Sequence, residues 1–109
     1  MSSTAGRLPG GASAASAAAK AGVGMFTRQV ANEVARHGVR VHCMAPGTVL
    51  TDRLARMPQQ VRQQVAADHP PERLGMLEDV ALATQFLVLD ATSWLTGVTL
   101  DDAGGRLMR

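Results

Sequence analysis

The chain has no tyrosine, and only 3% of its 109 residues are aromatic. Its apolar residues are mostly small aliphatic side chains and methionine, which each bury little surface, so one copy alone should gain little stability from its core. We therefore expect association with a second copy. A single cysteine, Cys43, excludes an internal disulfide framework and is typical of a reducing compartment.

Long apolar runs are also missing, since none approaches the roughly 18 residues of a membrane span. The first residues, MSSTAGRLPGG, lack the basic-then-apolar pattern of a secretion signal. The net charge is only +2, and the basic residues are scattered rather than clustered. These features predict a cytoplasmic protein that binds neither membranes nor nucleic acids.

The pattern of apolar and turn-forming residues predicts an α/β fold. Residues 13–37 should form a long helix, with Ser13 as its cap and Gly38 as its stop. Because the predicted strands are separated by helices, they should be parallel, but two strands are too few for an independent sheet. The remaining expected elements are a loop over 1–12, strands over 39–44 and 96–101, short helices within 52–68 and a helix over 77–90.

Several motifs occur in an order that resembles the C-terminal half of a short-chain dehydrogenase/reductase. The motifs are SSTAG at 2–6, Lys20, VRVHCMAPGTVLTD at 39–52, RLGMLEDVA at 73–81 and LTGVTLDDAGG at 95–105. The resemblance covers nearly the whole chain. It implies one truncated, Rossmann-like domain over residues 1–109, whose sheet is completed by a second copy.

The resemblance also implies an ancestral chemistry, the transfer of hydride between NAD(P) and an alcohol or carbonyl compound. In that family a serine orients the substrate oxygen, and a tyrosine acts as acid and base. A lysine four residues later lowers the tyrosine's pKa and binds ribose. Here Ser3 matches the serine and Lys20 matches the lysine, while the segment 46–51 matches the loop that touches the nicotinamide.

The departures from the family pattern predict that dehydrogenase activity has been lost. Ser16 stands where the tyrosine belongs, and its hydroxyl is a far weaker acid than a phenol with a pKa of roughly 10. The Gly-rich turn that binds a dinucleotide has no counterpart in the sequence, so we expect no NAD(P) binding. His42 replaces the family's usual asparagine, and Leu77 replaces a helix-opening proline.

The missing neighbour strand predicts a homodimer formed through the strand 39–44 and the helix 13–37. Antiparallel pairing of two such strands would bring His42 of both chains together. With a carboxylate from Asp52 or Asp101, they could bind zinc or another divalent metal. The first hypothesis is thus a metal-assisted hydrolase of activated esters or phosphoesters, acting on a small-molecule substrate.

Other interpretations remain open. Ser16 and Lys20, one helical turn apart, could form a nucleophile–base pair, and Ser3 and Lys20 could contribute to a site around His42. The chain could instead be an inactive fragment or an interaction module, or could retain some NAD(P)-dependent oxidoreductase activity. His69, in the sequence DHPP, is expected on the surface of a loop.

Overall fold

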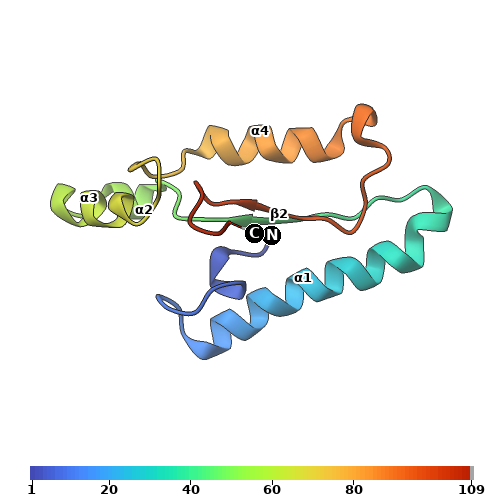
Figure 1. The fold of residues 1–109 in the computed structure, drawn as a ribbon, viewed down its shortest axis with the longest axis horizontal. Helices are drawn as coiled ribbons and strands as arrows, with labels where there is room; N and C mark the ends of the chain where they lie inside the picture. Colours follow the sequence, from blue (N-terminus) through green and yellow to red (C-terminus); the bar gives the residue numbers. More distant parts are fainter. Residues whose placement is uncertain (109) are drawn as a thin grey trace.

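The computed structural model describes residues 1–108, and its centre is a two-stranded parallel sheet. Strand β1 (Cys43–Pro46) pairs with β2 (Thr99–Asp102) in the register Cys43 to Thr99 through Pro46 to Asp102. Figure 1 shows helix α1 (Ala14–Val34) on one side of the sheet and α4 (Leu77–Val88) on the other. The α/β class and the parallel pairing were both predicted from the sequence.

Helix α1 follows its local sequence signals closely. The Ser13 Oγ accepts a hydrogen bond from the Ser16 backbone N–H at 3.2 Å, which satisfies one free donor at the start of the helix. The helix continues as a 3-10 turn, η2 (Ala35–His37). It ends at Gly38, whose φ of 73° suits glycine. The predicted long helix over 13–37 and both of its boundary residues are therefore confirmed.

Both strands begin later than the sequence pattern indicates, because a ladder needs two aligned backbones. The N–H of Val41 donates to the side chain of Thr96 at 3.2 Å instead of to a neighbouring backbone. Strand β1 also includes Pro46. The next N–H, that of Gly47, donates to Asp102 O, so the missing N–H of Pro46 faces the opposite edge and breaks no bond to β2.

The remaining helices agree with the sequence in kind. The predicted region 52–68 contains α2 (Asp52–Ala55) and α3 (Gln59–Ala67), with Pro58 between them. The predicted helix over 77–90 is α4, followed by the short 3-10 turn η3 (Asp90–Thr92). None of the helices within residues 1–108 has the length and hydropathy required to cross a membrane.

Arginine side chains hold both ends of α4. At its start, Asp79 accepts two hydrogen bonds from Arg73, at 2.7 and 3.2 Å, and one from the Met76 backbone at 2.7 Å. At its end, the guanidinium of Arg40 donates to backbone carbonyl groups of the last turn of α4 and of the residues that follow it. These carbonyls belong to Leu87, Val88, Leu89 and Thr92, at 2.9 to 3.2 Å.

The first residues form a structured segment rather than the simple loop predicted for 1–12. The Ser2 N–H donates to Met44 O on the free edge of β1 at 2.7 Å, and the Ser2 hydroxyl donates to Lys20 O at 2.6 Å. The 3-10 turn η1 (Thr4–Gly6) then packs on α1. A Cβ on Gly6 would lie only 2.5 Å from the backbone carbonyl carbon of Lys20.

The buried core is small, as the shortage of aromatic residues predicts. Its apolar members are Ala31, Cys43, Met44, Ala45, Leu87 and Ala103. Larger apolar side chains remain outside: Phe26 on α1 is 69% exposed, and Trp94 is 97% exposed. Cys43 is a free thiol buried in this core.

We expect Gly6→Ala to destabilise the protein by about 1–3 kcal/mol, because the new methyl group must displace one backbone segment from another. Gly22→Ala is the matched control, since a Cβ there meets nothing within 4 Å. That control should raise stability by about 0.5–1 kcal/mol through helix propensity. Urea unfolding followed by circular dichroism measures both effects. Equal stability changes in the two variants would contradict the close packing of η1 on α1.

Candidate functional site

The loop that follows β1 lies between two cavities. Its backbone is fixed by a bridge between Val49 and Gly75. Gly75 N donates to Thr48 O at 2.9 Å, and Leu50 N donates to Gly75 O at 2.8 Å. Gly47 and Val49 line both cavities, so this loop is their shared wall.

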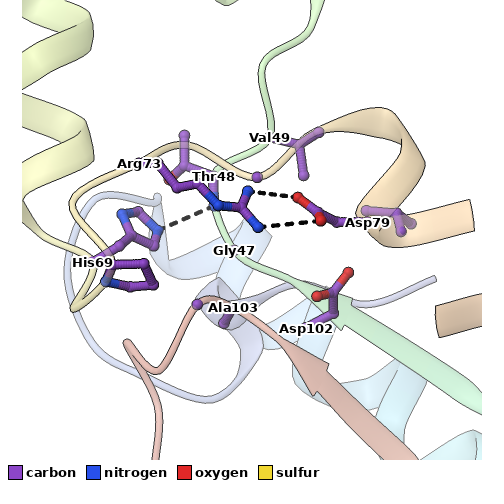
Figure 2. Close-up of a pocket in the computed structure, with 12 residues that line it drawn as sticks. Gly47, Thr48, Val49, His69, Arg73, Asp79, Asp102 and Ala103 are labelled. Carbon is purple, nitrogen blue, oxygen red and sulfur yellow. Dashed lines mark hydrogen bonds and ion pairs between the residues drawn. The ribbon is translucent and has the colours of Figure 1, made fainter. Parts of the chain in front are cut away.

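The first cavity is small and polar, with a volume of about 90 Å³. Figure 2 shows His69 against the loop on one side, and Arg73 paired with Asp79 on the other. His69 is only 2% exposed, so the prediction of a surface loop residue is wrong. Its burial results from contacts distant in sequence, including Gly47, where a Cβ would lie 3.3 Å from the His69 Nε2.

The hydrogen bonds of His69 assign its tautomer. Its Nδ1 lies 3.0 Å from the Val65 carbonyl oxygen and must donate to it, while its Nε2 accepts from the Thr48 N–H at 3.5 Å. A neutral imidazole with the proton on Nδ1 satisfies both bonds. His69 therefore positions the loop and has no free nitrogen for a ligand.

The carboxyl groups of this cavity differ in acidity. Hydrogen bonds from Arg73, and then from the Met76 backbone, lower the pKa of Asp79. Burial raises the pKa of Asp102, and the nearby charge of Asp79 adds to the increase, while Arg73 opposes it. Asp102 is therefore the carboxyl group that keeps its proton to the higher pH.

The second cavity is an apolar groove of about 790 Å³ between α4 and the first residues of the chain. The hydroxyl-bearing residues Ser3 and Thr51 are among those that line it. A groove of this size, with an apolar lining and a few polar groups, is typical of small-molecule sites. The rest of the lining is Met1, Ser2, Pro46, Gly47, Val49, Leu77, Val80, Ala81, Thr84, Gln85 and Val88.

The structure separates the residues that match the family's catalytic set. Ser3 lies in the apolar groove, and its Oγ accepts a hydrogen bond from Ala5 N at 3.2 Å. Ser16 is exposed in the first turn of α1. The Lys20 ammonium donates to Met1 O at 3.4 Å rather than to Ser16, and Lys20 lines a third, polar cavity. The geometry thus gives no support to a Ser16–Lys20 nucleophile–base pair.

His42 immediately precedes β1, and its imidazole is unusual. Both ring nitrogens are buried, and neither makes a hydrogen bond of ordinary geometry within residues 1–108. Burial lowers the pKa of His42 below 6.5, and the charge of Arg40 lowers it further, while the Leu95 backbone opposes the change. The side chain is therefore a neutral imidazole at neutral pH.

The carboxylates predicted to join His42 are engaged or located elsewhere. Asp101 pairs with Arg7 at 2.8 Å, and Asp52 is exposed at the start of α2. Across residues 1–108, no three histidine, cysteine or acidic side chains are grouped closely enough to hold a metal ion. A metal site shared by two chains stays a prediction, as does the homodimer.

The parallel sheet, with helices on both of its sides, defines the class of the protein as a Rossmann-like α/β protein. Comparison with known families is more specific. A family model described as Enoyl-(Acyl carrier protein) reductase matches residues 1–106. The chain belongs to this family of short-chain dehydrogenases/reductases, as its motifs imply.

Individual relatives agree with this assignment. The chain is 37% identical over 108 residues to the 3-oxoacyl-[acyl-carrier-protein] reductase FabG of Escherichia coli, covering 99% of this chain and 44% of that protein. It is 36% identical over 92 residues to a (3R)-3-hydroxyacyl-CoA dehydrogenase of Mus musculus, covering 84% of this chain and 36% of that protein.

A solved structure gives the same result. The crystal structure of a 3-oxoacyl-[acyl-carrier protein] reductase from Brucella melitensis superimposes with a TM-score of 0.92 at 33% identity, covering 99% of this chain and 41% of that one. The chain thus spans less than half the length of the relatives it matches.

The loop over residues 46–51 adjoins the apolar groove. Gly47 packs closely on Ala103, because a Cβ at position 47 would lie 3.0 Å from the Ala103 Cα. The 109 residues contain no Gly-rich turn that would hold the pyrophosphate.

We expect acid to destabilise the protein partly through His42. Because its pKa is lower in the folded state, the unfolded chain binds more protons, and stability falls as the pH decreases below 6.5. Urea unfolding at about pH 7.5 and about pH 5.5 measures the loss. His42→Asn should lose less stability than the native protein over this range, because it lacks the imidazole whose pKa is lowered. Identical losses would contradict a buried neutral His42.

Proposed function

We propose that this chain is a short-chain dehydrogenase/reductase module that binds an apolar, acyl-type ligand without reducing it. The observation that carries the proposal is the apolar groove of about 790 Å³, whose lining includes Ser3 and Thr51. The names of the relatives, which act on acyl groups carried by a protein or by coenzyme A, support an acyl-type ligand.

The loss of reduction follows from Ser16. A nicotinamide cofactor supplies hydride when bound, but reduction of a carbonyl group also needs a proton at its oxygen. Ser16 offers an aliphatic hydroxyl on a short side chain, exposed at the start of α1. The Lys20 ammonium donates to Met1 O, so it does not take the place of the missing phenol beside Ser3.

Calorimetric titration with acetoacetyl-CoA and a medium-chain acyl-CoA tests ligand binding. We expect saturable binding that Ala81→Phe weakens by about tenfold, because the new ring fills the groove. Ala18→Phe, at an exposed position of α1 outside the lining of the groove, is the control and should bind normally. NADPH absorbance in the same samples should stay constant. Oxidation of NADPH by the native chain, abolished in Lys20→Ala, would overturn the non-reducing function.

A second candidate rests on His42. A neutral imidazole can act as a metal ligand, and the metal-assisted hydrolase predicted from the sequence needs His42 in this role. Its site needs a second copy of the chain, and the exposed apolar residues of α1 and α4, such as Phe26 and Leu82, favour self-association. The Ser2–Met44 hydrogen bond occupies part of the β1 edge, so strand pairing would involve residues 39–42.

Zinc content, sedimentation and hydrolysis of an activated ester, measured on one preparation, test this candidate. The hydrolase predicts a dimer that contains zinc, and an esterase activity that a chelator removes. His42→Ala should lower both zinc content and activity, whereas His37→Ala, at an exposed position, should change neither. A monomer without zinc, or hydrolysis unchanged in His42→Ala, would exclude it.

A further inference from the structure

A third cavity, of about 230 Å³, carries a different chemical character from the groove. It lies where η1, α1 and β2 meet, and three cationic side chains line it: Arg7, Lys20 and Arg28. Asp101 neutralises one of them through its 2.8 Å ion pair with Arg7, in which both side chains are largely buried. The cavity therefore keeps a net positive charge.

The sequence of α1 shapes this cavity. Lys20, Gly24 and Arg28 recur at four-residue steps and share one face of the helix. The two cations start about 12 Å apart along the helix axis. Gly24 places no side chain between them, so the helix surface is notched at the point that both long side chains can reach.

A hydroxyl group lies at the base of the notch. The Thr99 Oγ1 is shielded from solvent and has no hydrogen-bond partner within residues 1–108. A Cβ on Gly24 would lie 3.8 Å from this oxygen, which places the hydroxyl directly beneath the notch. Buried polar groups normally find a partner, so an unpartnered hydroxyl beside the cationic side chains of Lys20 and Arg28 indicates a missing acceptor.

We propose that this cavity binds a phosphate group. Arg28 can donate two parallel hydrogen bonds to phosphate oxygens, Lys20 adds a compact positive charge, and Thr99 donates from below. Arg7 contributes less, because Asp101 already engages it. The site is separate from the groove, and it does not depend on the acyl-type ligand or on His42.

Calorimetric titration at low ionic strength, with inorganic phosphate in one arm and glycerol 3-phosphate in the other, tests the site. We expect binding of one phosphate group per chain, weakened by salt. A preference for glycerol 3-phosphate would identify a phosphate ester as the ligand class, and a preference for inorganic phosphate would identify the free ion. No binding in either arm would overturn the proposal.

Matched pairs of variants distinguish phosphate binding in this cavity from nonspecific attraction of phosphate to the positively charged protein. Arg28→Gln should weaken binding by about tenfold, whereas Arg36→Gln, with the same charge change at an exposed position, should not. Gly24→Ala should also weaken binding, because it fills the notch, while Gly22→Ala has the same helix-propensity effect and should bind normally. Equal affinities within both pairs would overturn the site.

For two further variants, Asp101→Asn and Thr99→Val, we expect effects that would not occur if these residues served only the fold. Asp101→Asn releases Arg7 and should tighten phosphate binding, whereas Asp52→Asn should leave it unchanged. Thr99→Val removes an unpartnered hydroxyl, so it should weaken binding without lowering the urea midpoint. A large loss of stability in Thr99→Val, with unchanged affinity, would show that the hydroxyl serves the fold instead.

Discussion

The docking of residues 2–6 onto α1 and β1 determines much of the remaining geometry. Ser2 alone bonds both partners, through its N–H to Met44 O and its hydroxyl to Lys20 O, and Gly6 permits backbone contact with α1. The same segment places Ser3 in the apolar groove and forms part of the cationic cavity. Two chemically different cavities thus depend on one short stretch whose fit tolerates no side chain at position 6.

Replacement of one catalytic side chain does not require the rest of the site to change its structure. The loop after β1 is still held by the bridge from Val49 to Gly75 and by the buried His69. These contacts do not involve Ser16. A site can therefore lose its proton donor and keep its shape, which is the physical basis of the binding function that we propose for this chain.

The sequence predicted best what depends on neighbouring residues. Ser13 and Gly38 bound α1 because a cap and a left-handed glycine act within one helical turn. Contacts between distant segments were missed. His69 is buried through Gly47 and Val65, and Asp101 is engaged by Arg7, which lies near the other end of the chain. Both strands were predicted, but each begins several residues later than expected. The ends of a strand depend on its partner strand, which the local sequence pattern does not reveal.

Helix α4 is held in place by hydrogen bonds at both of its ends. Arg73 and Met76 bind Asp79 in its first turn, and Arg40 binds the backbone carbonyls at its end. The side chains of α4 that line the groove lie between these two sets of contacts. These hydrogen bonds fix the positions of the two ends of α4, whereas the groove-facing side chains between them can rearrange. We expect the groove to discriminate among ligands by their length more strictly than by their width.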